Sequence, residues 1–172
     1  SPVADEGGRK IMETEVVFRY ALAPLVRFPK GGILAAQIRD NTRREANFFF
    51  SLADGTAKLV LRIAPASQGK LPSLVTMNAG KEIASATLSK PIPTGQWTPV
   101  EIKWDEKEAV VTVGGADVAR LELPASFDPK TAALQTSMVD DLRLEGDGSF
   151  SLDWENGFAA SVTPREEGSD IV

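Results

Sequence analysis

Hydrophobic and polar residues alternate along most of this chain. In residues 98–105, single charged residues separate Val100 from Ile102 and Ile102 from Trp104. Successive side chains on a β-strand point to opposite faces, so this two-residue period is typical of strands with one buried face. The same period recurs in residues 13–23, 32–40, 57–63 and 149–155. The pattern predicts a chain built from short β-strands.

Glycine-containing turn signals separate these segments. They are Gly31-Gly32, Asp54-Gly55, Gly114-Gly115, Asp147-Gly148 and Asn156-Gly157. Such pairs supply residues that tolerate the positive φ angles of tight hairpins. No segment shows a sustained period of about 3.6 residues, which an amphipathic helix would need. Short strands joined by tight turns predict an all-β fold, either a sandwich or a barrel.

Three consecutive phenylalanines interrupt the alternation in the segment REANFFFSLADG. If one face of this strand is the core, at least one aromatic ring must point the other way. The best register places Phe48 and Phe50 in the core, with Leu52. It leaves Phe49 pointing outward, beside Asn47 and Ser51.

The composition narrows the chemistry that the chain can perform. Its 172 residues fit one domain, and we expect residues 1–172 to form it, with a core over about residues 13–163 and flexible polar ends. The sequence contains neither cysteine nor histidine. That excludes disulfides, thiolate or imidazole metal sites, and catalysis by a histidine base.

The charge and the apolar runs of the chain indicate which binding partners and which cellular location to expect. The formal net charge is −5 and there is no block of lysine or arginine, so we do not expect nucleic acid as a partner. No apolar run approaches the ~20 residues that a membrane span needs. The chain lacks cysteine and begins with Ser1-Pro2. We expect an extracytoplasmic bacterial protein (periplasmic, cell-surface or secreted) that belongs to a longer chain with neighbouring domains.

The segment TGQWTPVEIKWDEKEAVVTVGG resembles the laminin-G-like core of the concanavalin A-like lectin/glucanase superfamily. There, a Gly-x-Trp begins a strand of the form W-x-x-V-x-I-x-W, and a V-x-V strand and a glycine turn follow. Residues 32–63 resemble earlier strands of that superfamily, and SMVDDLRLEG resembles a late one. The resemblance implies a two-sheet antiparallel jelly-roll sandwich, without identifying a subfamily. A fold of this kind does not by itself give a function.

The resemblance raises the alternative of a glycoside hydrolase. Laminarinase-type enzymes of the superfamily carry E-x-D-x-(x)-E on one strand, with two glutamates as nucleophile and general acid/base. The nearest match is SLDWE, which supplies Asp153 and Glu155. Its first position is Ser151, which cannot act as the carboxylate nucleophile. We therefore favour a solvated polar edge for this segment.

A polysaccharide lyase is the other enzymatic alternative. Alginate lyases of this fold use R-x-E and Q-(I/V)-H motifs. Here Gln37 and Ile38 fit the second motif, but Arg39 replaces the histidine. Arg43 and Glu45 form an R-x-E that follows this pair instead of preceding it. The base for proton abstraction is missing, so an enzyme would need an atypical site. Its suspects are Asp153, Glu155, Glu45, Gln37 and Arg39.

We expect no cofactor, and calcium is the one metal that the resemblance suggests. Members of the superfamily often bind Ca²⁺ through carboxylates in loops, and oxygen ligands are what this ion prefers. Asp40 with Asn41, and Asp140 with Asp141, are the conceivable ligands. No dense D-x-D-x-D spacing supports them. Adjacent residues of a strand, such as Asp140 and Asp141, also point to opposite faces.

The aromatic residues indicate where a ligand would bind. The alternation places Trp104, Trp154 and Tyr20 in the core, and Trp97 opens its strand at a structural position, so Phe49 is the only strand-borne aromatic left outside. The other outward polar candidates for ligand binding are Arg19, Gln37, Arg39, Arg62 and Lys103. If these residues share one concave face, their guanidinium groups suit carboxylates or sulfates.

The sequence thus predicts a non-catalytic, carbohydrate-binding-like module, and an anionic glycan as its ligand. The missing catalytic residues and the resemblance both favour this function over an enzyme. A structural or protein-interaction domain that keeps the fold without a glycan site is the remaining alternative.

Overall fold

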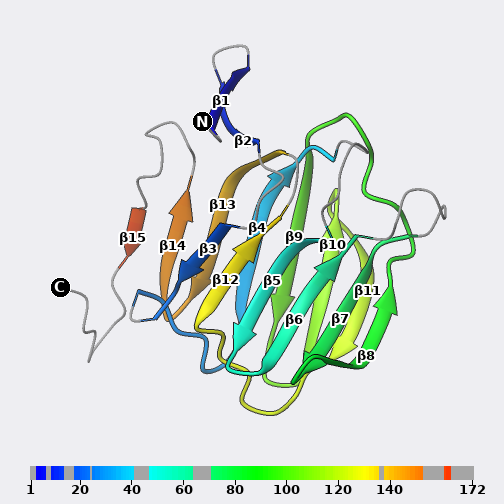
Figure 1. The fold of residues 1–172 in the computed structure, drawn as a ribbon, viewed down its shortest axis with the longest axis vertical. Coiled ribbons are helices and arrows are strands. Elements are labelled where there is room, and N and C mark those ends of the chain that lie inside the picture. Colours follow the sequence, from blue (N-terminus) through cyan, green and yellow to red (C-terminus); the bar gives the residue numbers. More distant parts are fainter. Residues whose placement is uncertain are drawn as a thin grey trace.

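The computed structural model shows two antiparallel β-sheets that pack face to face (Figure 1). The structure describes residues 3–6, 9–13, 18–23, 25–40, 47–63, 71–135, 138–152 and 161–163, with side chains over 19–23, 25–40, 47–63, 71–135 and 139–151. Within this part of the chain there is no helix, and so none that could cross a membrane. The predicted all-β sandwich is therefore confirmed.

One sheet has nine strands. Seven follow the order β1-β2-β13-β4-β9-β10-β11, while β14 pairs with β13 and with β15. Their bounds are β1 Val3–Glu6, β2 Arg9–Glu13, β4 Gly32–Ile38, β9 Thr98–Trp104, β10 Glu108–Val113, β11 Ala116–Glu122, β13 Met138–Gly146, β14 Gly148–Leu152 and β15 Ser161–Thr163. Residues 1–10 were expected to be a polar tail, yet they contribute β1 and the start of β2.

The other sheet has six strands in the order β3-β12-β5-β6-β7-β8. Their bounds are β3 Phe18–Ala21, β5 Phe48–Asp54, β6 Ala57–Arg62, β7 Ser73–Asn78, β8 Lys81–Thr87 and β12 Thr131–Leu134. In Figure 1 this sheet lies in front of the nine-stranded one. Strands distant in sequence, such as β12 and β5, are neighbours in it. The order is that of a jelly roll, in which each sheet takes strands from both halves of the chain.

The core lies between the two sheets, where the inward faces of the alternating strands meet. Val100, Ile102 and Trp104 are buried there, as their pattern predicts. Tyr20 also packs against the core, with its ring 5.7 Å from that of Phe150. Each buried aromatic side chain removes a large apolar area from water, which is the main force that holds the sheets together.

A β-bulge in β5 decides how the three phenylalanines face. Phe50 pairs with Leu61 of β6. The next pair is Phe48 with Arg62, which leaves Phe49 as an extra residue in β5. Phe49 is 1% exposed and packs in the core beside Phe50. The prediction that Phe49 points outward is therefore wrong, because strict alternation does not anticipate a bulge.

The single tyrosine gives a spectroscopic test of this core. The Tyr20 hydroxyl is buried and has no hydrogen-bond partner within the described residues, and burial raises the pKa of Tyr20 from 10.0 to about 12. Folding stability is then fully present below about pH 10 and falls as the pH rises through the folded pKa. We expect the ultraviolet absorbance of tyrosinate to appear near pH 12 in the native protein and near pH 10 in denaturant. Equal midpoints in both conditions would show that Tyr20 is exposed.

Candidate functional site

The ligand-binding residues predicted from the sequence do not share one face. Arg19 on β3 and Arg62 on β6 belong to the six-stranded sheet, whereas Gln37 on β4 and Lys103 on β9 belong to the nine-stranded sheet. The outward faces of the two sheets point away from each other, with the core between them. Phe49 is part of that core. The condition that these residues share one concave face is therefore not met. The sequence does not say which sheet each strand joins.

The outer face of the six-stranded sheet has an apolar floor. Leu61 and Leu74 pair with each other in the core, so the next pair, Val60 and Val75, points outward. Val60 is 8% and Val75 0% exposed, although both lie outside the core cluster. The two valines belong to a row of cross-strand partners that runs across the sheet. The row consists of Arg19, Ala133, Ser51, Val60, Val75 and Ser85.

Arg62 and Glu82 form an ion pair that crosses this floor above Val75. Arg62 on β6 pairs with Ser73, and Glu82 on β8 pairs with Met77. On the intervening strand β7, Val75 lies midway between Ser73 and Met77. The Arg62 Nη2 and Glu82 Oε1 atoms are 2.9 Å apart, and the two side chains are 46% and 45% exposed. A planar guanidinium and a carboxylate are therefore held together over an apolar floor and remain open to solvent.

A bulge in β8 brings Glu82 to this position. On the inward side, Thr76 of β7 pairs with Ala84. The next pair is Met77 with Glu82, which leaves Ile83 as the extra residue. Ile83 is 66% exposed and is the one large hydrophobic side chain that is exposed among the described residues. Without this bulge, Ile83 would stand opposite Met77, and Glu82 would turn toward the interior.

The aromatic residue of the six-stranded face is Phe48. Because Phe48 pairs with Arg62, whose side chain points outward, the Phe48 ring lies on the same face. Phe48 is half-buried, unlike its two neighbours. The bulge that buries Phe49 is thus what places Phe48 beside the Arg62–Glu82 pair. Sequence reasoning assigned Phe48 to the core and missed this role.

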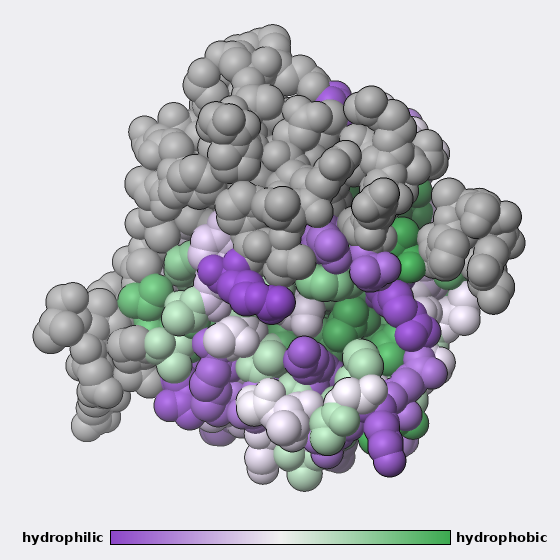
Figure 2. All heavy atoms as spheres, in the orientation of Figure 1, coloured by the Kyte–Doolittle hydropathy of each residue, from purple (hydrophilic) through white to green (hydrophobic). Residues whose placement is uncertain are grey.

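Basic side chains outnumber acidic ones around this ion pair. Arg19 stands at one end of the floor, and Lys58 of β6 pairs with Met77 on the outward side. Within the described residues, neither Arg19 nor Lys58 forms an ion pair. Figure 2 looks onto this side of the molecule and shows hydrophilic and apolar residues interspersed on the part drawn in colour. The face therefore combines an apolar floor, an aromatic ring and an excess of positive charge.

The remaining candidates from the sequence lie on the nine-stranded face. Gln37 and Lys103 point outward from β4 and β9. Arg39 follows β4, and its guanidinium lies 5.2 Å from the centre of the Trp97 ring, at a distance typical of a cation–π contact. Trp97, for which the sequence indicates a structural position at the start of its strand, is half-buried. Trp104 is buried as predicted, and Trp154 lies outside the described residues.

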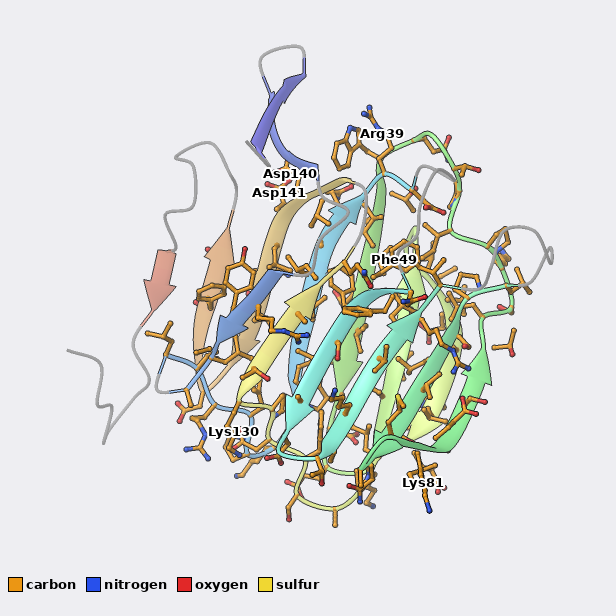
Figure 3. All side chains as sticks on the ribbon, viewed as in Figure 1. Arg39, Phe49, Lys81, Lys130, Asp140 and Asp141 are labelled. Carbon is orange, nitrogen blue, oxygen red and sulfur yellow. The ribbon has the colours of Figure 1, made fainter. Side chains whose placement is uncertain are left out.

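The alternative catalytic and calcium sites are only partly covered by the structure. Asp153, Glu155, Glu45 and Asn41 lie outside the described residues. Asp140 is buried and Asp141 exposed, both at the end of the molecule where Arg39 also lies (Figure 3). Among the residues that the structure describes, no three Asp or Glu side chains gather in a way that would hold a metal ion. Calcium binding therefore stays a prediction of the sequence.

No protein-family model and no curated protein sequence matches this chain. Solved structures do match it. Domain 4 of an extracellular GH43 arabinanase from Geobacillus stearothermophilus, in complex with arabinotriose, has a TM-score of 0.60 and 17% identity, over 87% of this chain and 75% of that one. A galectin from Caenorhabditis elegans has a TM-score of 0.55 and 11% identity, over 77% of this chain and 90% of the galectin.

A carbohydrate-binding module from Bacillus subtilis also matches, with a TM-score of 0.52 and 9% identity, over 80% of this chain and 85% of that one. These matches and the observed sheets show that the chain has the concanavalin A-like jelly-roll fold, as the resemblance in its sequence implies. At such low identity they establish the fold and leave the function to the site.

Proposed function

We propose that this chain is a non-catalytic carbohydrate-binding domain whose ligand lies on the outer face of the six-stranded sheet. One observation carries the proposal. A half-buried Phe48 ring stands beside the Arg62–Glu82 ion pair, which crosses an apolar floor and stays open to solvent. Two bulges, in different strands, are needed to bring these three side chains to one face.

This arrangement matches the chemistry of a sugar. A sugar ring has an apolar C–H face, which packs on an aromatic ring, and a rim of hydroxyl groups that both donate and accept hydrogen bonds. Phe48 offers the aromatic surface. Arg62 supplies N–H donors and Glu82 supplies acceptors, so neighbouring hydroxyls find both kinds of partner. Binding sites for small ligands generally combine apolar surface with a few polar groups in this way.

The structural relatives support the proposal at the level of the fold. They include galectins, a carbohydrate-binding module and an arabinanase domain in complex with arabinotriose. The outward-facing aromatic ring and ion pair of this chain support the choice of this face for the proposed site.

We further propose that the glycan carries anionic sugar units. Arg19 and Lys58 lack ion-pair partners among the described residues and flank a pair that is itself neutral. Arg19 lies three strands from Arg62, which corresponds to about 14 Å at the usual strand spacing. That span suits two or three sugar units, with a carboxylate meeting Arg19 at the far end. An extracytoplasmic location, where such polymers occur, belongs to the same proposal.

Arg62→Ala is expected to weaken glycan binding by about tenfold to a hundredfold, because hydrogen bonds to charged groups contribute about 1.5–3 kcal/mol. Phe48→Ala is also expected to weaken it, because the change removes the aromatic surface on which the sugar ring packs. The variants are Phe48→Ala and Arg62→Ala, and the measurement is affinity electrophoresis in gels that contain polygalacturonate. Lys103→Ala is the matched control, since it removes the same charge from the opposite sheet. We expect this control to bind like the parent protein.

A second comparison tests the charge of the glycan. Arg19→Ala should weaken binding to polygalacturonate and leave binding to neutral galactan unchanged, and added salt should weaken only the former. Equal binding of both polymers would contradict the anionic preference. If the chain is retarded by no acidic or neutral polysaccharide, the proposed function is wrong.

A further inference from the structure

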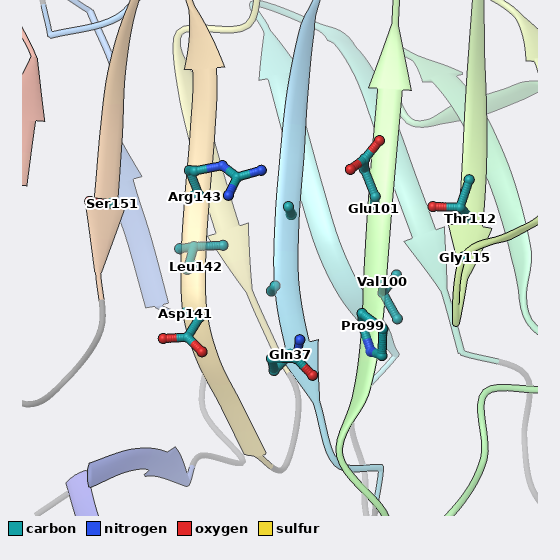
Figure 4. A pocket seen from close by; sticks show the side chains of 12 residues that line it. Gln37, Pro99, Val100, Glu101, Thr112, Gly115, Asp141, Leu142, Arg143 and Ser151 are labelled. Carbon is teal, nitrogen blue, oxygen red and sulfur yellow. The ribbon is translucent and has the colours of Figure 1, made fainter. Parts of the chain in front are cut away.

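A groove of about 690 Å³ crosses the outer face of the nine-stranded sheet, on the opposite side of the molecule from the six-stranded face (Figure 4). Its walls come from five neighbouring strands, β14, β13, β4, β9 and β10. Its volume lies within the range of about 300–1,000 Å³ that is typical of small-ligand sites. A site of ligand size therefore exists on a face that carries no part of the proposed glycan site.

The register of the strands shows how the groove is built. Arg143 of β13 pairs with Ala35 of β4, and Ala35 pairs with Glu101 of β9. The three residues form one row, with a small side chain in its centre. At a strand spacing of about 4.8 Å, the backbones of Arg143 and Glu101 stand about 10 Å apart across the alanine. That gap is wide enough for one sugar-sized ring lying on Ala35.

Gln37, Glu101 and Arg143 line the groove, and their side chains do not pair with one another. Gln37 occupies the next outward position on β4 after Ala35, and like Glu101 it is half-buried. Within the described part of the chain, neither the Gln37 nor the Glu101 side chain makes a hydrogen bond or ion pair. Arg143 forms an ion pair through Nε with Glu145 Oε1 at 2.9 Å, which leaves its two terminal nitrogens available. Figure 4 shows Arg143, Glu101 and Gln37 around the same hollow.

The charge of the groove differs from that of the six-stranded face. Glu101 contributes a carboxylate that has no ion-pair partner within the described residues, whereas the positive charge of Arg143 is already paired with Glu145. An anionic ligand would therefore meet an excess of negative charge in this groove. A neutral ligand with several hydroxyl groups would find donors on Arg143 and Gln37 and acceptors on Glu101 and Gln37.

We propose that this groove is a second, independent ligand site, which takes a neutral polyhydroxylated ligand such as an uncharged sugar unit. The ring lies over Ala35, with its hydroxyls between Arg143 and Glu101 and with Gln37 at one edge. Because the two sites face away from each other, one chain would hold two glycan segments at once. Such a chain can cross-link polymers without forming a dimer.

Amide NMR mapping with arabinotriose, cellotriose and maltotriose at millimolar concentration tests the proposal. The expected result is a set of chemical-shift changes at Gln37, at Glu101 and on β13, for at least one of the three probes. Glu101→Ala should weaken that binding by about tenfold, because it removes a charged acceptor. Lys103→Ala is the matched control, since Lys103 lies two residues further along the same face of β9, outside the groove.

The outcomes separate this inference from the proposed function. Shifts at Gln37 and Glu101 that persist in the Phe48→Ala variant support the groove as an independent site. Shifts confined to Phe48, Arg62 and β8 overturn the groove and support only the six-stranded face. No shift in the groove with any of the three trisaccharides also overturns it. Shifts in the groove alone would confirm this site and count against the six-stranded face.

Discussion

Replacing Gly31 with alanine is expected to destabilise the sandwich by about 3–5 kcal/mol, the largest effect that we expect from a Gly→Ala change among the described residues. A Cβ atom at Gly31 would lie 2.1 Å from the carbonyl oxygen of Trp104 and 2.6 Å from the Cα of Asp105. Both are backbone atoms, so neither can move aside cheaply. The φ angle of Gly31 is +106°, which side chains rarely adopt. Steric overlap and backbone strain therefore add up at one position.

Substitutions at two other glycines distinguish steric overlap from backbone strain. At Gly32, which lacks a positive φ, a Cβ would lie 2.4 Å from Phe28 Cδ1 and 2.7 Å from the carbonyl oxygen of Glu145, so Gly32→Ala tests overlap. Gly55 has a φ of +60° and nothing within 4 Å, so Gly55→Ala tests strain alone, at about 1–2 kcal/mol. Urea denaturation of the three variants gives the comparison. A Gly31→Ala loss no larger than that of Gly55→Ala would refute the close approach of Gly31 to Trp104.

Replacing Asp128 with alanine is expected to cost about 3–5 kcal/mol, because the change leaves a buried donor and a cation without their partner. Asp128 is buried and accepts hydrogen bonds from Arg27 Nε at 2.9 Å and from the Phe28 backbone N–H at 2.8 Å. Its own N–H donates to Asp54 at 3.0 Å, and Lys130 donates to both Asp54 and the Asp128 carbonyl. This network lies at the end of the molecule opposite Arg39 (Figure 3).

The same carboxylate makes stability depend on pH. Burial by itself would raise the pKa of Asp128, but the hydrogen bonds from Arg27 and Phe28 and the charge of Lys130 outweigh it and lower the pKa below its usual value. A lowered folded pKa means that the stabilisation is fully present above the unfolded pKa of about 3.9 and is lost as the pH falls through the folded pKa. The protein should therefore lose stability steeply below about pH 4.

Denaturation of the parent and of Asp128→Asn across acidic pH measures this contribution. We expect Asp128→Asn to be destabilised near neutral pH and to show a smaller further loss below about pH 4, because it has no carboxylate left to protonate. Asp117→Ala serves as the control. Its carboxylate is 66% exposed and 4.0 Å from Arg120, so its loss should change stability by less than about 0.5 kcal/mol. Parallel pH profiles for parent and Asp128→Asn would rule out this role.

Local patterns in the sequence were sufficient to predict the class of fold. Alternation over residues 98–105 predicts a strand with Val100, Ile102 and Trp104 inward. The structure has this strand as β9, and all three side chains are buried. Gly114-Gly115 predicts the turn between β10 and β11. These features depend on side-chain direction and turn geometry over a few residues, which is why they can be predicted without the tertiary structure.

The assignment of residues to a common face could not be predicted in the same way. Gln37 and Arg62 have similar outward positions in their own strands, yet they lie on opposite sides of the molecule because β4 and β6 join different sheets. Sheet membership follows from pairings between strands distant in sequence. Those pairings are decided by how well whole hydrophobic faces pack together, and no short segment carries that information.

The candidate binding face shows most clearly which features the sequence determined and which ones the tertiary structure decided. The sequence by itself determined that strands form around the phenylalanines, and that one of the three rings must leave the core. Only the tertiary structure decided that this ring is Phe48, because a bulge opposite Leu61 turns Phe49 inward. A second bulge likewise turned Glu82 toward Arg62. A bulge forms where the pairing of two strands must adjust to their packing on the opposite sheet, so it depends on contacts that the sequence pattern of one strand does not contain.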